Sequence, residues 1–249
     1  MDRRTVPTQR VSLPPRVVVI APAWNQGDQI GRVVRDALEQ TGLPVWVVDD
    51  GSSDTTAQEA KAAGARVLSH PTNRGVGAAI RTGLVTARAS GFEIAVIVSG
   101  SGKTPACEVP KLLATLADCH ADLVQGSRYA PGGRALRLPT HRRLGTRVPA
   151  LLFTLLRGRR VTDSTSGFRA IRLSPLNDPS IDLGQRWLDT YELEPYLLWT
   201  AMRRHRVVEV GVTIAYPHNS AAAYTKMVTV VDWWRICRPL FLLALGLRR

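Results

Sequence analysis

The residues best suited to chemistry lie at positions 47–56, where the sequence reads VVDDGSSDTT. An apolar run ends there in Asp49 and Asp50, and a glycine and a Ser/Asp-rich segment follow. Carboxylates at the end of a strand accept hydrogen bonds from ribose hydroxyls and from N–H groups of a base. Ser53 or Asp54 also suits the N-cap of a following helix. The segment therefore predicts either a nucleotide-binding edge or a simple turn with a capped helix.

A second polar segment, SGSGKTP, follows the apolar run at residues 94–98. Its Lys103 offers a cation that can neutralise a leaving phosphate. The string also resembles the end of a P-loop, but the first glycine of that motif falls at Ile97, and Pro105 follows where its helix should begin. A nucleoside triphosphatase or kinase is therefore the weaker interpretation.

The chain is strongly basic, with a formal charge of +13 and a pI near 10.7. Residues 128–172 hold eleven arginines and one acid, Asp163, which suggests a phosphate-handling face or a solvated basic surface. Nucleic acid also attracts basic proteins, but no recognition motif is present, and Asp49 and Asp50 would repel a phosphate backbone at the presumed cleft. We expect no nucleic-acid partner.

Length and cysteine spacing indicate one intracellular domain. With 249 residues and 45% hydrophobic content, the chain suits a single α/β domain. Three widely spaced cysteines fit neither a disulfide framework nor a zinc site, and a reducing cytoplasm is expected. Residues 1–15 lack the apolar stretch of a signal peptide and are predicted to be a flexible tail.

The C-terminal residues 231–249 predict an amphipathic or apolar helix. Their apolar run at 240–247 is too short to span a bilayer, but it follows Trp233, Trp234, Arg235 and Arg238. This composition suits a helix lying at a membrane surface, and equally a terminal helix docked on the domain. We therefore expect a cytoplasmic protein, with peripheral association at the inner membrane face as one alternative.

Short β-branched runs alternate with segments of helical periodicity, which predicts an open, doubly wound sheet with ligands at the carboxyl ends of its strands. The first half is expected to bind a nucleotide and the second an acceptor. The predicted strands are 16–21, 45–48, 66–69, 94–98, 122–125 and 207–212, and the predicted helices are 30–38, 55–63, 77–89, 110–116, 146–156 and 194–203.

Three motifs in order resemble family 2 glycosyltransferases, and four more resemble its dolichyl-phosphate mannosyltransferase or polyprenyl-phosphate glycosyltransferase branch. The resemblance covers nearly all of residues 17–240. The first three are IAPAWNQ (20–26), VVDDGSSDTT (47–56) and NRGVGAA (73–79), and the others are QGSRYAPGG (125–133), DSTSGFRAI (163–171), VVEVGV (207–212) and YTKM (224–227).

The resemblance implies a single GT-A domain, an α/β fold with a Rossmann-like, mixed but mostly parallel sheet flanked by helices. The domain would occupy 16–230, with a nucleotide-sugar-binding half (16–127) and an acceptor-binding half (128–230). Asp49 would face the nucleobase and Asp50 the ribose. The implied donor-binding residues are Pro22, Ala23, Asn25, Asp49, Asp50, Gly51, Ser52, Asn73, Gly75, Gly77, Ser99, Gly100, Ser101 and Lys226.

The chain departs from the family at the acidic pair that holds a divalent cation. Ser99 and Ser101 occupy those positions, and hydroxyls without a carboxylate are poor ligands for Mg²⁺ or Mn²⁺. The sequence therefore assigns no metal ligands and puts the cofactor in doubt. Lys103, Arg128 and Lys226 are instead expected to hold the donor diphosphate.

The acceptor is expected to be polyprenyl phosphate or a small hydroxylated metabolite. A hydroxyl acceptor needs a general base, whereas a phosphate is already anionic and needs none. Glu194 best matches the family's acidic position. The candidate catalytic residues are Lys103, Arg128, Asp189, Glu192 and Glu194, and the candidate acceptor-binding residues are Arg142, Arg143, Asp163, Ser166, Gly167 and Arg169.

The sequence thus predicts an enzyme that transfers a sugar from a UDP- or GDP-sugar, with inversion by family analogy. The alternative is a catalytically inactive subunit of the same fold that binds a nucleotide sugar or a lipid. Turnover of the donor separates the two.

Overall fold

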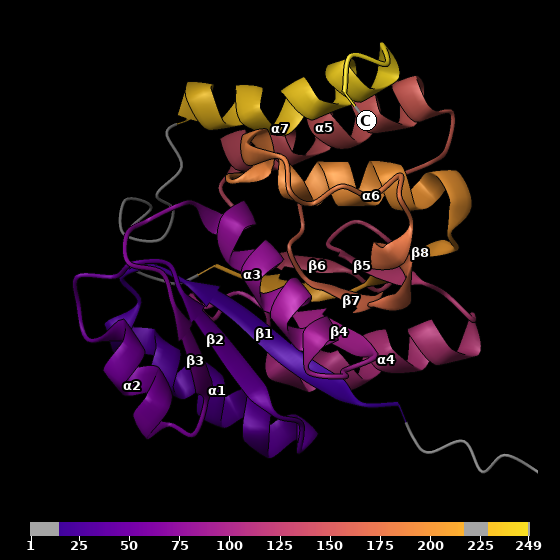
Figure 1. The fold of residues 1–249 in the computed structure, drawn as a ribbon. Coiled ribbons are helices and arrows are strands. Elements are labelled where there is room, and N and C mark those ends of the chain that lie inside the picture. Colours follow the sequence, from indigo (N-terminus) through magenta and orange to yellow (C-terminus); the bar gives the residue numbers. More distant parts are fainter. Residues whose placement is uncertain (1–14, 217–228, 249) are drawn as a thin grey trace, which may run out of the picture.

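A computed structural model describes residues 15–216 and 229–248 (Figure 1). Its strands are β1 Val17–Ala23, β2 Val45–Asp49, β3 Arg66–Ser69, β4 Ile94–Ile97, β5 Leu123–Ser127, β6 Arg134–Leu136, β7 Arg169–Arg172, β8 Val207–Gly211 and β9 Thr213–Ala215. Its α-helices are α1 Gly27–Thr41, α2 Thr56–Ala62, α3 Val76–Ala89, α4 Val109–Asp118, α5 Thr140–Arg157, α6 Leu193–Arg204 and α7 Thr229–Ala244.

The main sheet has seven strands in the order β3-β2-β1-β4-β7-β5-β8, and β6 pairs with β9 separately. Strand β7 runs antiparallel to both β4 and β5, whereas the other neighbours are parallel. The strands β1, β2, β4 and β5 therefore share one direction, and their C-terminal ends lie along the same edge. This mixed, mostly parallel sheet with flanking helices confirms the expected α/β fold.

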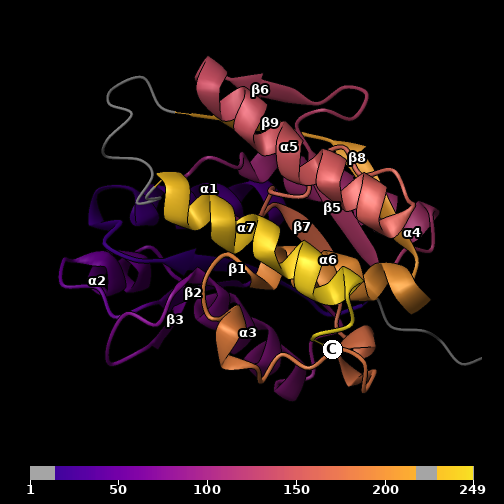
Figure 2. The ribbon, with the colours of Figure 1, turned by 90° about the horizontal axis from the view of Figure 1, so that it is seen from above.

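Alternate side chains of each central strand enter different cores, as the two-residue period of a strand requires. Val18 and Ile20 pack in the core shared with α3 and α6, whereas Val19 and Ala21 pack in the core shared with α1 and α4. Both faces are covered, so the strands are apolar throughout. Beyond α6, helices α5 and α7 lie side by side in a further layer (Figures 1 and 2).

Three features differ from the sequence-based expectations. Helix α5 begins at Thr140 rather than at residue 146, directly after the extended Pro139. Strand β7 was not predicted, because a four-residue strand with arginine at both ends lacks an apolar pattern. The short strands β6 and β9 were also not predicted. The predicted tail lies almost wholly outside the described residues, and no described helix is long and apolar enough to cross a bilayer.

Candidate active site

The loops after β1 and β2 are joined into one edge. The backbone N–H of Asn25 donates to Ser52 Oγ at 2.8 Å, and the side-chain Oδ1 of Asn25 accepts the backbone N–H of Ser53 at 2.9 Å. Asp49 accepts the Ser52 N–H at 3.2 Å, and its carboxylate is buried. These bonds hold two segments of the predicted donor site together without a ligand.

Asp50 anchors the loop that leads into α3. Its Oδ1 accepts the Arg74 N–H at 3.0 Å and its Oδ2 accepts the Gly75 N–H at 2.7 Å. His70 Nδ1 lies 2.6 Å from Oδ1. The sequence offered no reason to assign His70 more than a place in a loop, yet it is only 8% exposed and contacts a predicted donor-site carboxylate.

The predicted donor-site glycines fit against neighbouring backbone. At Gly75, where φ is +106°, a methyl group would overlap the carbonyl oxygen of Asp189. At Gly77 it would overlap the carbonyl oxygen of Leu188. The Ala78 N–H donates to Asp189 O at 2.9 Å. These glycines therefore let the start of α3 touch the segment before α6, and their contact with a nucleotide stays a prediction.

Two further glycines pack the loops of the donor edge closely. A methyl group on Gly51 would overlap the backbone between Thr72 and Asn73, so the loop after β2 touches the loop after β3. A methyl group on Gly100 would lie 2.5 Å from Pro22 O and 3.1 Å from Ala23 Cβ. The segment after β4 therefore packs directly on the C-terminal end of β1.

The two serines at the acidic-pair positions bind each other. Ser99 Oγ and Ser101 Oγ are 2.8 Å apart, and the Ser99 N–H donates to Thr104 Oγ1 at 2.8 Å. Residues 15–216 and 229–248 contain no group of three acids, histidines or cysteines arranged for a metal ion. Because Mg²⁺ and Mn²⁺ prefer carboxylate oxygens, the residues around Ser99 and Ser101 do not fit a hard divalent cation.

Lys103 lies in a cluster of three cations. Burial lowers the pKa of its ammonium to about 8, and repulsion from Arg142 and then from Arg128 adds to the effect. The Nζ atom is 5.9 Å from the centre of the Tyr216 ring, and Lys103 O accepts the Ala215 N–H at 2.9 Å. We call Lys103, Arg128 and Arg142 the cation cluster.

Arg128 is fixed by a buried carboxylate. Its Nε and Nη2 each donate to Asp163 at 2.6 Å, and Nη1 donates to the Tyr216 hydroxyl at 2.7 Å. Burial opposes the charge, but the attraction and hydrogen bonds of Asp163 outweigh it and raise the pKa of Arg128. Asp163, an expected acceptor-binding residue, is therefore engaged as the buried partner of Arg128. Tyr216 was missed, and no sequence pattern around it signals this contact.

The three candidate bases lie in different surroundings. Asp189 forms an ion pair with Arg81, and Glu192 accepts the hydroxyl of Thr190. Glu194 has 15% of its side chain exposed and lies 3.9 Å from Arg169. Burial raises the pKa of Glu194, while Arg169 and Arg128 oppose this rise. Of the three, Glu194 is thus the carboxyl with an electrostatic link to the cation cluster.

Several expected acceptor-binding residues form the interior behind this cluster. Arg169 is fully buried and donates to Ser166 O at 2.8 Å and to Glu194 O at 3.1 Å. A methyl group on Gly167 would lie 2.6 Å from Glu194 Oε1, so glycine makes room for that carboxyl group. Arg142 is half-buried and Arg143 exposed in the first turn of α5. Lys226 lies outside the described residues.

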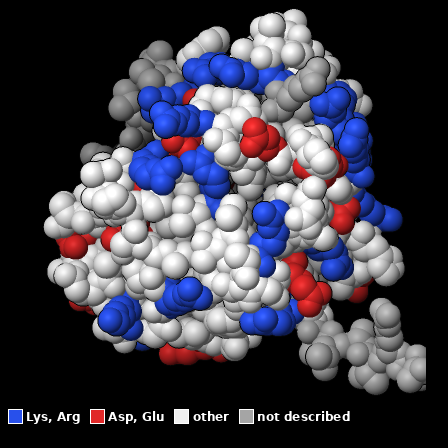
Figure 3. Space-filling model, in the orientation of Figure 1, with Lys and Arg blue, Asp and Glu red and all other residues white. Residues whose placement is uncertain are grey.

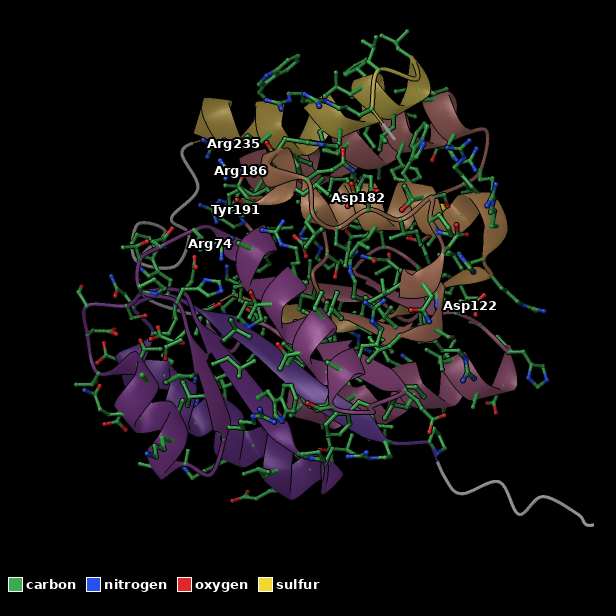
Figure 4. The ribbon with its side chains drawn as sticks, viewed as in Figure 1. Arg74, Asp122, Asp182, Arg186, Tyr191 and Arg235 are labelled. Carbon is green, nitrogen blue, oxygen red and sulfur yellow. The ribbon has the colours of Figure 1, made fainter. Side chains whose placement is uncertain are left out.

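Basic side chains gather on one side of the molecule, between the loop before α3 and helix α7. Figure 4 shows Arg74, Arg186 and Arg235 along this side, with Tyr191 between Arg74 and Arg186. The space-filling view shows Lys and Arg side chains gathered on the same side (Figure 3). An anionic substrate approaching this side would meet a positive surface.

Comparison with known proteins decides the family. Residues 18–178 match the family model described as Glycosyl transferase family 2. The chain belongs to this family. It is therefore a nucleotide-sugar-dependent glycosyltransferase, as the motifs predicted.

Two relatives of this glycosyltransferase carry names that specify an acceptor. An undecaprenyl-phosphate mannosyltransferase of Micrococcus luteus is 32% identical over 80% of this chain and 83% of its own length. A polyprenol monophosphomannose synthase of Mycolicibacterium smegmatis is 33% identical over 85% of this chain and 80% of its own length.

A solved structure supports the fold. Glucosyl-3-phosphoglycerate synthase of Mycobacterium tuberculosis, in complex with Mn²⁺, UDP-glucose and phosphoglyceric acid, superposes with a TM-score of 0.72. The match covers 94% of this chain and 81% of that one at 21% identity. At this identity the likeness concerns the GT-A fold alone.

Proposed function

We propose that this glycosyltransferase transfers a hexose from a UDP- or GDP-sugar to the phosphate of a polyprenyl phosphate. The cation cluster carries the proposal, because a reaction between a sugar diphosphate and a second phosphate concentrates negative charge at one point. Burial lowers the pKa of Lys103, and repulsion from Arg142 and then from Arg128 adds to the effect, as expected where cations gather to bind an anion. The names of the two relatives support the acceptor.

The donor would bind across the C-terminal ends of β1, β2 and β4. Asp49 would meet the base and Asp50 the ribose, where Oδ2 has accepted one protein hydrogen bond and retains a lone pair for a hydroxyl. The sugar diphosphate would then extend past Ser99, Gly100 and Ser101 toward Lys103. The anomeric carbon would then lie beside the cation cluster.

The chemistry is a single displacement. An oxygen of the acceptor phosphate attacks the anomeric carbon, and the bond from that carbon to the diphosphate breaks with its electron pair leaving on the nucleoside diphosphate. Configuration inverts. Because the nucleophile is already anionic, no proton has to be removed, and Lys103 offsets the charge that develops on the leaving group.

We propose that cationic side chains replace a divalent metal in this step. The relevant hydroxyls of Ser99 and Ser101 are paired with each other, and they are weak ligands for a hard cation. The solved glucosyl-3-phosphoglycerate synthase structure contains Mn²⁺. The side chains of this protein therefore favour a metal-independent reaction, whereas its structural neighbour favours a metal-dependent one. Activity measured with and without a chelator distinguishes them.

A hydroxylated small molecule is the second candidate acceptor, favoured by Glu194. Burial raises the pKa of this carboxyl group, as is common for a general base. Such a base would take the proton of the attacking hydroxyl. The two acceptors therefore differ in their need for Glu194.

The test supplies purified full-length protein with UDP- and GDP-hexoses and offers polyprenyl phosphate, the corresponding polyprenol or a small polyol, each with and without a chelator. We expect chelator-resistant transfer to polyprenyl phosphate from one donor class. Transfer only to hydroxyl acceptors would refute polyprenyl phosphate as the acceptor in favour of a hydroxylated molecule. Complete inactivation by the chelator would refute metal independence. Nucleotide binding without turnover would indicate the inactive alternative.

We also propose that the α5/α7 layer rests on the membrane that holds this acceptor. Leu151 and Leu155 in α5 are 60% and 69% exposed, and Trp234 in α7 is 58% exposed. Leu245 and Leu247 follow α7 and are also exposed. Apolar side chains among cations suit an anionic lipid surface. The arginines of these helices are Arg142, Arg143, Arg147 and Arg157 in α5 and Arg235 and Arg238 in α7.

Vesicle sedimentation tests this surface. The protein should bind vesicles that contain anionic phospholipid more strongly than neutral ones, and Leu155→Ser with Trp234→Ser should weaken binding. Val85→Ser, which changes an exposed apolar residue on α3, is the matched control. Equal loss from the control would argue against the α5/α7 surface.

A further inference from the structure

His70 is the central link of a buried chain of hydrogen bonds behind the predicted donor site. Its Nδ1 lies 2.6 Å from Asp50 Oδ1, and its Nε2 lies 2.9 Å from Thr82 Oγ1. The ring is nearly inaccessible to solvent. It precedes the glycine motif at 73–79, and no step of the proposed chemistry uses it.

The carboxylate fixes the direction of the first of these bonds. An ionised carboxylate only accepts, so His70 Nδ1 carries the hydrogen and donates to Asp50. In a neutral ring Nε2 is then an acceptor, and the Thr82 hydroxyl can donate to it. Every polar atom of the imidazole is thereby satisfied, as a buried polar group requires.

This series of hydrogen bonds connects β2, β3 and α3. The His70 N–H donates to Asp49 O at 2.9 Å, which ties the end of β3 to the end of β2. Thr82 belongs to α3, and Asp50 holds the N–H groups of Arg74 and Gly75 at the start of that helix. His70 thus keeps the carboxylate in the orientation that fixes the loop before α3.

We propose that His70 is a positioning residue for the nucleotide sugar. The hydrogen bond from His70 to Asp50 Oδ1 orients the carboxylate so that one lone pair of Oδ2 faces the donor. It also keeps residues 73–75 in the conformation that binds the donor, because the same carboxylate accepts the Arg74 and Gly75 N–H groups. This inference rests on the proposed donor role of Asp50. Donor affinity then depends on the imidazole ring of His70, although this ring itself touches no substrate.

Steady-state kinetics with three variants tests the proposal. His70→Leu removes both bonds and should raise the donor KM about tenfold, the effect of one charge-assisted hydrogen bond, with kcat and the acceptor KM nearly unchanged. His70→Asn retains an N–H near the position of Nδ1 and should restore most of the donor affinity. Thr82→Val should give a smaller rise, because the bond to Asp50 remains.

A general structural defect would give a different pattern. It would lower kcat and affect donor and acceptor alike, and asparagine would rescue no better than leucine. That result, or an unchanged donor KM in a folded His70→Leu protein, would overturn the proposal. If His70→Leu does not fold, Thr82→Val decides instead, because it removes only the bond to His70 Nε2: a raised donor KM supports the proposal, and a donor KM equal to that of the wild type overturns it.

Two measurements separate this inference from the proposed reaction. Amide hydrogen exchange at Arg74 and Gly75 should be faster in His70→Leu than in the wild type, with no substrate present. Calorimetric titration with UDP and GDP reports donor-site affinity without turnover. Unchanged exchange overturns the inference even if the enzyme is active. Weaker nucleotide binding in the variant supports it even if polyprenyl phosphate is not the acceptor.

Discussion

The predicted donor and acceptor halves of this glycosyltransferase satisfy their buried charges differently. In the donor half, Asp49 and Asp50 are buried and accept backbone N–H groups. In the acceptor half, Arg128 and Arg169 are buried and donate to Asp163 and to carbonyl oxygens. Carboxylates suit the hydroxyls and N–H groups of a nucleoside, whereas guanidinium groups suit phosphates.

The difference also affects tolerance to mutation. Asp49, whose carboxylate accepts the backbone N–H of Ser52, keeps this partner when neighbouring side chains change. A guanidinium held by one buried carboxylate loses its counter-charge through a single substitution. The acceptor half should therefore be the more sensitive of the two.

The largest expected effect is on stability and comes from Asp163→Asn. The change leaves the buried Arg128 charge without its carboxylate and should lower the free energy of unfolding by about 3–5 kcal/mol. Asp49→Asn is the matched change in the donor half and should cost only about 1 kcal/mol, because an amide oxygen still accepts the Ser52 N–H. Urea denaturation measures both. Equal losses would remove the distinction between the halves.

Next in size is Lys103→Ala. Removing a cation that offsets leaving-group charge should lower kcat by about 100-fold. Lys61→Ala changes an exposed lysine on α2 and serves as the control, with an expected kcat close to that of the wild type. A kcat for Lys103→Ala within about threefold of the wild type would place the neutralising charge elsewhere.

The pH profile sharpens the role of the same lysine. The pKa of Lys103 is lowered to about 8, so the ammonium is lost as the pH rises through 8, and the rate should then fall by about tenfold per pH unit. Lys103→Arg keeps its charge and should give a flat profile between about pH 7 and 9. A wild-type profile as flat as that of the arginine variant would contradict the assignment.

The same shift predicts how stability depends on pH. Because the pKa is lower in the folded state than in the unfolded chain, the unfolded chain binds more protons between about pH 8 and 10.5. The contribution of Lys103 to the free energy of unfolding should therefore increase with pH over that range. Lys103→Met, compared with the wild type at both limits, measures this increase.

The smallest effect is expected from Glu194→Gln. If the acceptor is a phosphate, no base is needed, and kcat should stay within about threefold of the wild-type value. A hydroxyl acceptor would instead require the carboxylate, with a loss of about 100-fold or more. Glu39→Gln, at an exposed position on α1, controls for the loss of a charge.

The sequence predicts the donor half better than the acceptor half, for physical reasons. Strands β1, β2 and β4 are buried on both faces, so their apolar runs are visible in the sequence. Strand β7 is only four residues long and carries a buried arginine, which no hydrophobic pattern reveals. Motif resemblance predicted Asp50 and Arg128 as site residues, and their contact with a substrate stays a prediction.

Long-range polar partners were not predictable in this way. The Tyr216 hydroxyl meets an arginine 88 positions earlier in the chain, and His70 meets Thr82 across a loop and the start of α3. Such contacts depend on how the elements pack, and they leave no periodic pattern in the sequence. The motif DSTSGFRAI suggested Asp163 as an acceptor-binding residue, but the sequence could not reveal that the guanidinium of Arg128 donates two hydrogen bonds to that carboxylate.

The close fit of Gly75 and Gly77 against residues 188–190 has a consequence for protein engineering. Exchanging the acceptor half between homologues is an attractive way to change acceptor specificity, but a crossover anywhere between 77 and 188 joins backbones that evolved in different parents. With no side chain to yield at either glycine, a small shift of the grafted segment would collide with the first turn of α3. Productive chimeras should therefore inherit both segments from the same parent.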